Sequence, residues 1–68
     1  MKLIDVLTLI SDYTNVRVFD SNKNELARYN GKDSIPEELN DEIVSQIRSG
    51  LAYENGNEIP YIGIKLAM

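Results

Sequence analysis

The segment from Asp20 to Asn24 matches the opening of a calcium-binding loop. Asp20, Asn22 and Asn24 place oxygen-bearing side chains at alternate positions, where they could converge on a hard cation. The match then fails, because the position that requires glycine holds Glu25 and the position that requires the final glutamate holds Gly31. We therefore interpret the segment as a solvated hairpin turn, and we expect no metal site.

Four carboxylates lie close together with no base between them: Glu37, Glu38, Asp41 and Glu42. Such a run could imitate DNA phosphates, so an inhibitor of a host defence or DNA-binding protein that acts through an acidic, DNA-mimicking surface is one hypothesis. The simpler interpretation is that carboxylates in a first helical turn face its partial positive charge. Paired carboxylates can also perform acid–base catalysis, but this requires burial, and this polar segment is expected to be exposed.

Several kinds of chemistry are excluded by composition. Cysteine and histidine are both absent, which removes disulfides, thiolate nucleophiles, imidazole bases and zinc sites with sulfur or nitrogen ligands. The glycines match neither a dinucleotide-binding fingerprint nor a P-loop. We therefore expect a protein that is not an enzyme and holds no cofactor. A 68-residue chain has a small core, so association with another chain is the remaining source of stability.

The charge distribution and the short apolar runs argue against nucleic acids and membranes as partners, and the net charge is −4. The excess acid lies in residues 35–68, where Arg48 and Lys65 are the only bases. Phosphate backbones are bound by clusters of lysine and arginine, and no such cluster is visible along the chain, so we expect no direct nucleic-acid binding. The apolar runs are far shorter than the roughly 20 residues that span a bilayer. We expect a cytoplasmic protein that does not bind membranes.

Hydrophobic spacing predicts the elements of the first half. Apolar residues recur at helical intervals and predict a helix over residues 2–12: Leu3, Val6, Leu7 and Ile10. Residues 16–20 alternate β-branched and aromatic side chains with polar ones, which is typical of a strand. The turn formers of 21–24 and a second strand over 25–29 complete a hairpin over residues 16–30.

The second half contains one ambiguous stretch. Ser34 and Glu37 have the spacing of a capping box, which predicts that a helix begins near Ile35. The pattern permits one helix over 35–49, or a short helix that ends near Asn40 and a strand over 42–48. The last two strands, over 51–54 and 59–66, flank the hairpin turn signal Asn55-Gly56-Asn57.

The order of these motifs resembles a group of small, acidic, uncharacterised proteins of phages, prophages and integrative elements of low-GC Gram-positive bacteria. The resemblance rests on residues 12–20, on Glu25-Leu26, on Ser34-Ile35-Pro36-Glu37-Glu38-Leu39 and on Glu42-Ile43-Val44-Ser45. In such sequences a strand usually follows the Ile-Pro-Glu-Glu-Leu turn, which favours the short helix near residues 35–40. The group has no assigned catalytic residues, so the resemblance implies a mobile-element setting and no mechanism.

We expect one α+β domain over residues 1–68, in which the N-terminal helix packs on a small antiparallel sheet of about three to five strands. Alternation directs one set of residues toward the helix: Val16, Val18, Leu26, Ile62, Ile64 and Leu66. The opposite face then holds Ala27, Lys65 and the candidate interface: Arg17, Phe19, Tyr29, Val44 and Tyr61.

A single long helix cannot cover both faces of the sheet, so the second face is open unless the loop 49–58 or the short helix covers part of it. We therefore expect a non-enzymatic protein-interaction module that forms a homo-oligomer through the aromatic face or through the edge strand 59–66. A host protein is the other candidate partner.

Overall fold

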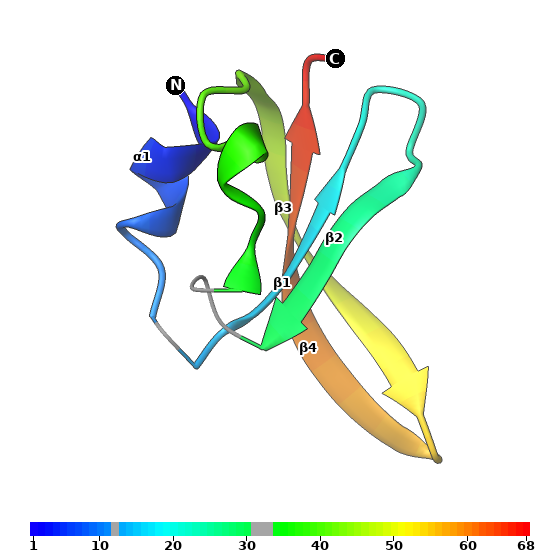
Figure 1. The fold of residues 1–68 in the computed structure, drawn as a ribbon. Coiled ribbons are helices and arrows are strands. Elements are labelled where there is room, and N and C mark those ends of the chain that lie inside the picture. Colours follow the sequence, from blue (N-terminus) through cyan, green and yellow to red (C-terminus); the bar gives the residue numbers. More distant parts are fainter. Residues whose placement is uncertain (12, 31–33) are drawn as a thin grey trace.

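The computed structural model describes residues 1–11, 13–30 and 34–68. A short helix, α1 (Leu3–Leu7), precedes the strands β1 (Asn15–Phe19) and β2 (Glu25–Asn30), and a single 3-10 turn (Glu37–Leu39) leads to β3 (Val44–Glu54) and β4 (Asn57–Leu66) (Figure 1). The strands form one sheet in the order β2-β1-β4-β3. The domain is therefore mostly β. No helix in the described ranges is long and apolar enough to cross a membrane.

Helix α1 forms where predicted but is much shorter than the predicted 2–12, whose last residue lies outside the described residues. Its buried side chains are Leu3, Val6 and Leu7. Hydrogen bonds to another segment stabilise its first turn. The backbone N–H groups of Leu3 and Ile4 donate to the carbonyls of Glu42 and Asn40, in the segment that leads into β3. Directly beyond Leu7 the chain is exposed, with Leu9 80% exposed, and packing against the core resumes only at Ile10. A short helix needs tertiary packing, so it ends where the packing ends.

The sheet is mixed, whereas the sequence predicted an antiparallel one. The hairpin of β1 and β2 and the hairpin of β3 and β4 are antiparallel, as expected. The two hairpins meet through β1 and β4, which pair in parallel from Val16 with Ile62 to Phe19 with Lys65. Alternation identifies strands, but it does not give the relative direction of two strands that are far apart in the chain.

Residues 44–48 belong to strand β3, so the alternative of one helix over 35–49 is wrong, and the predicted strand 42–48 begins two residues later than expected. The predicted short helix is a single 3-10 turn, in which the Asn40 N–H donates to the Glu37 carbonyl at 3.0 Å. Strand β3 then runs without interruption into the segment that was predicted as a separate strand. Its hairpin with β4 turns at Asn55 and Gly56, whose φ angles of 52° and 81° are those of a tight type I′ turn.

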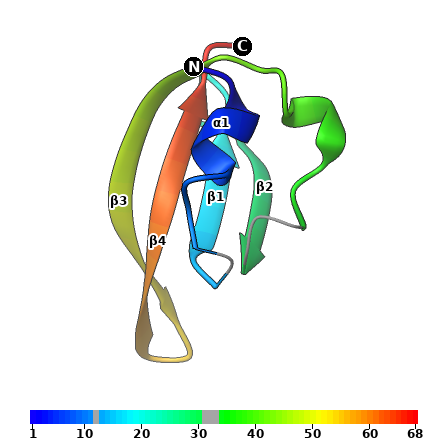
Figure 2. The same cartoon turned by 90° about the vertical axis from the view of Figure 1, so that its left-hand side faces the viewer.

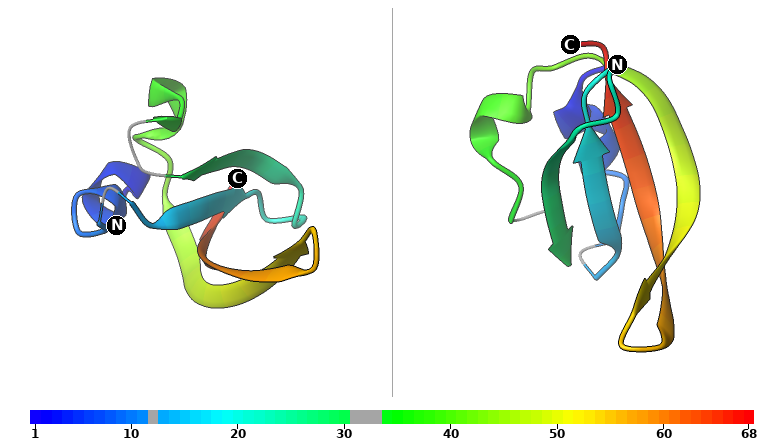
Figure 3. Two further views of the ribbon diagram at one scale, coloured as in Figure 1. Left: turned by 90° about the horizontal axis from the view of Figure 1, so that it is seen from below. Right: turned by 90° about the vertical axis from the view of Figure 1, so that its right-hand side faces the viewer.

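One side of the sheet carries the core. Helix α1 lies in front of β1 and β4 in Figure 2, and the 34–40 segment is on the same side of the sheet. The buried residues come from both segments and from three strands: Leu3, Val6, Leu7, Val16, Val18, Ala27, Ile35, Ile64 and Leu66. The sheet curls away from this core, so that its other side is concave (Figure 3). We call that concave side the inner face.

The predicted assignment of residues to the two faces is partly wrong. Val16, Val18, Ile62, Ile64 and Leu66 do pack on the α1 side. Ala27, Tyr29 and Val44 also pack there, although they were predicted on the opposite face, and Leu26 is 38% exposed instead of buried. Cross-strand partners share a face, and Val16 pairs with Tyr29, Val18 with Ala27 and Val44 with Leu66. The hairpin register decides this, and a one-residue slip reverses every side chain.

Candidate functional site

The inner face is a surface that neither α1 nor the 34–40 segment covers. Arg17 and Phe19 of β1 lie opposite Gly63 and Lys65 of β4. On the other side of β4, strand β3 adds Gln46, Arg48 and Gly50, which pair with Lys65, Gly63 and Tyr61. The face comprises residues from all four strands, most of them polar, charged or aromatic: Arg17, Phe19, Glu25, Arg28, Gln46, Arg48, Gly50, Ala52, Glu54, Ile59, Tyr61, Gly63 and Lys65.

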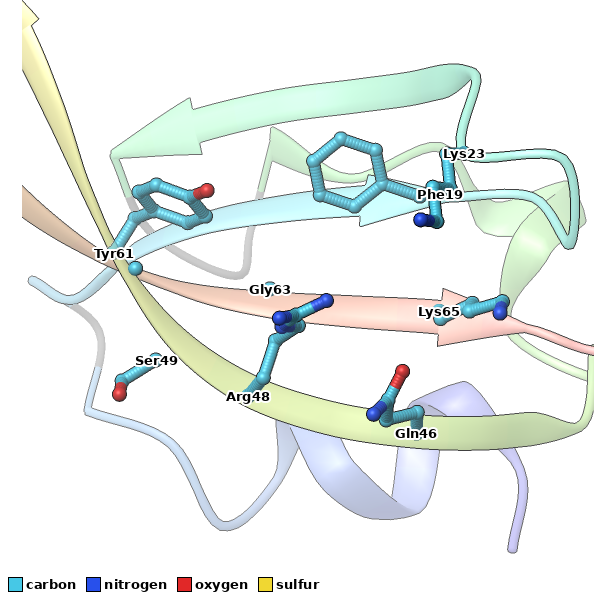
Figure 4. A pocket seen from close by; sticks show the side chains of 9 residues that line it. Phe19, Lys23, Gln46, Arg48, Ser49, Tyr61, Gly63 and Lys65 are labelled. Carbon is cyan, nitrogen blue, oxygen red and sulfur yellow. The ribbon is translucent and has the colours of Figure 1, made fainter.

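A hollow of about 260 Å³ lies in this face. Figure 4 shows the rings of Phe19 and Tyr61 on one side of it, with Arg48 extending across β4 toward Gly63. The side chains around it come from β1, from the turn after β1, from β3 and from β4: Phe19, Lys23, Gln46, Arg48, Ser49, Gly50, Tyr61, Gly63 and Lys65.

Tyr61 is held in place by close contacts on several sides. A Cβ at Gly50 would come closer to the Tyr61 ring than real Cβ atoms do, so the ring occupies the space that a side chain at position 50 would need. The guanidinium carbon of Arg17 lies 4.5 Å from the ring centroid, which is cation–π distance. The phenol therefore forms a pre-positioned wall of the hollow.

Arg17 is itself held by an ion-pair network at the β2 side of the face. Its guanidinium lies 3.9 Å from carboxylate oxygens of both Glu25 and Glu54. Arg28 contacts the same two acids, at 3.0 Å and 3.9 Å. Two bases and two acids therefore balance here. Such exposed pairs contribute little stability individually, but the shared network limits where Arg17 can point.

The hollow itself carries unbalanced positive charge. Lys23, Arg48 and Lys65 line it, and its lining holds no acidic residue from the part of the chain that the structure describes. The ion pairs found within residues 1–11, 13–30 and 34–68 do not involve these three bases. A local excess of +3 thus lies within a chain whose net charge is −4. The linear sequence gave no sign of it, because the three bases come from three separate segments.

The turn between β1 and β2 is organised by Asp20, which was considered as a metal ligand. One carboxylate oxygen accepts the backbone N–H groups of Asn22 and Asn24, each at 2.9 Å, and the other accepts the Asn24 side-chain amide at 3.1 Å. These hydrogen bonds, led by that of the Asn24 backbone, lower the pKa of Asp20. The residues described contain no group of three or more potential acidic ligands. The result is a structured turn that presents Lys23 at the hollow.

The candidate interface predicted from sequence is split by the sheet. Arg17, Phe19 and Tyr61 lie together on the inner face, and each is half-buried. Tyr29 and Val44 lie on the other side, packed against the core. Those two residues are therefore not part of an inner-face surface.

The acidic segment lies on the α1 side of the sheet. Glu37 and Glu38 are exposed on the 3-10 turn. Asp41 forms an ion pair with Lys2 at 3.5 Å, and Glu42 is half-buried where its carbonyl accepts the Leu3 N–H. DNA mimicry by these four acids stays a prediction.

A second uncovered surface is the outer edge of β3. The predicted edge strand 59–66 is wrong in its 62–65 portion, because those residues of β4 lie between β1 and β3. The N-terminal residues pair with β3 only at its start, where the Val44 N–H donates to the Met1 carbonyl. Apolar side chains follow this edge, and Ile47, Leu51 and Tyr53 are 49%, 55% and 71% exposed.

Comparison with known proteins adds no relative. The chain matches no protein-family model, and no curated protein or solved structure matches it significantly.

Proposed function

We propose that this chain is a non-enzymatic protein-interaction module that self-associates through the outer edge of β3. The resemblance of its motifs to small acidic proteins of phages and other mobile elements supports a role in such an element. The observation that carries the proposal is the combination of an 11-residue edge strand with exposed apolar side chains along it.

An edge strand presents unpaired backbone N–H and C=O groups that can pair with another chain. Natural proteins usually protect such an edge with charge, proline or a covering segment. Beyond Val44 the edge of β3 has little such protection. Ile47, Leu51 and Tyr53 lie on one face of the strand, and about half or more of each residue's surface is exposed. Pairing with a second chain would satisfy the backbone and remove these side chains from water together.

A second copy of the chain is the simplest partner. Closed dimers have two-fold symmetry, and an antiparallel pair of identical strands has that symmetry. If the axis passes near Ser49 or Gly50, Ile47 of one copy lies opposite Leu51 or Tyr53 of the other. Both arrangements bring apolar side chains into cross-strand contact, which stabilises an antiparallel pair. The result is a continuous eight-stranded sheet, twice the four strands of one copy.

Size-exclusion chromatography with light scattering tests this at high micromolar concentration. The expected mass is twice the 7.7 kDa of one chain. Leu51→Lys places a charge on the edge and is expected to give a monomer, because a lysine at the pairing strand resists edge-to-edge association.

The matched control is Leu9→Lys, which changes an 80% exposed leucine away from β3. This variant is expected to keep the mass of the unchanged chain. A monomeric unchanged chain would contradict the proposal, and so would equal behaviour of the two lysine variants.

A further inference from the structure

The hollow of the inner face has features that pairing along β3 does not use. It combines an accessible aromatic ring, a fixed phenol and three bases without a neighbouring acid in its lining. We propose that this hollow binds a nucleotide unit, meaning an aromatic base that carries a phosphate, either as a free nucleotide or as part of a single strand. The proposal is independent of self-association.

The aromatic part of the hollow suits a planar base. Phe19 projects from β1 into the hollow and is half-buried, so its stem is anchored while part of the ring remains accessible (Figure 4). Tyr61 cannot move freely, because Gly50 and Arg17 hold its ring. Base–aromatic stacking is the main sequence-tolerant contact by which proteins bind single strands. Since the Tyr61 ring already lies between Gly50 and the Arg17 guanidinium, Phe19 is the stacking surface for the base, and Tyr61 forms a rigid boundary of the hollow beside it.

The charged part suits a phosphate. Lys23, Arg48 and Lys65 surround the same space as the rings. The described lining of the hollow holds three bases and no acid, although the chain as a whole is acidic. This local excess of positive charge favours anions. Gln46 adds a neutral hydrogen-bonding side chain to the lining, which can contact the polar edge of a base.

Size and shape favour a nucleotide over an acidic peptide. About 260 Å³ can hold one nucleotide unit but not a folded segment. An acidic peptide would use the three bases and leave the Phe19 ring without a planar partner. We therefore treat an acidic peptide as a competing outcome of the test.

The direct test measures binding of the full chain to a fluorescent oligothymidylate by anisotropy, and to a mononucleotide by chemical-shift changes of the inner-face amides. One neutralised phosphate gives a log–log salt slope of about −0.7 on a single strand, so the strand affinity is expected to fall about 2- to 3-fold between about 50 and about 200 mM salt. Binding of the mononucleotide alone identifies a free nucleotide as the ligand, and tighter binding of the strand identifies a nucleic acid. Either result supports the proposal.

Two variants separate stacking from charge. Phe19→Leu retains an apolar side chain but removes the ring, and it is expected to weaken binding about 5-fold or more. The double variant Arg48→Gln, Lys65→Gln removes two charges, and it is expected to weaken binding about 10-fold or more. Lys2→Gln is the matched control, because it removes one charge on the α1 side, away from the hollow. It is expected to change the affinity by less than about 2-fold.

Circular dichroism verifies that each variant is folded before its affinity is interpreted. The proposal is overturned if neither nucleotide probe binds at millimolar concentration, or if binding is the same in Phe19→Leu and in the control. It is also overturned if a polyglutamate peptide binds as tightly as the oligothymidylate, because the hollow would then recognise negative charge alone.

Discussion

At the scale of single residues, the arrangement of the inner face depends on Gly50. Strand interiors rarely favour glycine, which has no side chain to pack and loses more entropy on folding. Here its missing Cβ leaves room for the Tyr61 ring, which packs over the backbone and under the Arg17 guanidinium. Nothing in the local sequence pattern indicates that a tyrosine eleven residues away lies across Gly50.

Gly50→Ala is therefore expected to keep the fold but displace the Tyr61 ring. The added methyl group would overlap the far end of the Tyr61 side chain and force the ring away from Arg17, so we expect a loss of about 1 kcal/mol, comparable to one cation–π contact. Denaturant unfolding measures the loss, and NMR shifts of the Tyr61 ring protons report the displacement.

Gly63→Ala is the matched control for that variant. Its Cβ would lie 3.4 Å from Arg48 Cγ and from Tyr61 Cε2, which requires only a small adjustment. An unchanged Tyr61 ring in Gly50→Ala, or an equal disturbance in both variants, would show that the close approach at position 50 is not what positions the ring.

At the scale of elements, local patterns predicted the existence of elements better than their length or direction. The Asn55-Gly56 turn and the hairpin of β1 and β2 could be predicted from the sequence, because turn-forming residues and strand alternation are patterns that extend over only a few residues. The parallel pairing of β1 with β4 joins residues more than forty apart in the chain, as Val16 and Ile62 show, and no local signal reports it. The length of α1 depends on where its packing partners end, which is also non-local.

Leu3→Ala tests whether packing, and not helix propensity, maintains α1. Leu3 is fully buried against the sheet, and alanine has the higher helix propensity, so a helix held by propensity would gain from the change. We expect instead a loss of about 2 to 5 kcal/mol, which would unfold much of a domain this small.

Ile4→Ala provides the comparison within the same turn. Ile4 is 37% exposed, so we expect its truncation to cost about 1 kcal/mol or less. Urea unfolding followed by far-ultraviolet circular dichroism measures both variants. Similar losses at the two positions would contradict the assignment of α1 stability to its buried face.

At the scale of the whole molecule, the fold separates charges that are mixed along the chain. The acidic segment of residues 37–42 lies on the α1 side, whereas Lys23, Arg48 and Lys65 meet on the inner face. The sequence showed a net charge of −4 and no cluster of bases along the chain, so we expected no direct nucleic-acid binding. The curled sheet and the order of its strands decide which bases become neighbours, so the basic hollow could not be predicted before the topology was known.

The same topology leads to a prediction about hydrogen exchange. The residues of β4 that lie between β1 and β3, Ile62 to Lys65, have neighbours on both sides, so their amides are expected to exchange slowest at any protein concentration.

The outward-pointing amides of β3 between Ile47 and Tyr53 have no strand beside them in one copy. They are expected to exchange fast when the protein is dilute and to become protected as its concentration rises through the dimerisation range, because a second β3 then accepts their hydrogen bonds. Exchange followed by NMR at two concentrations measures both groups of amides. Protection of β3 that is independent of concentration, while the mass doubles, would place the contact between copies on another surface.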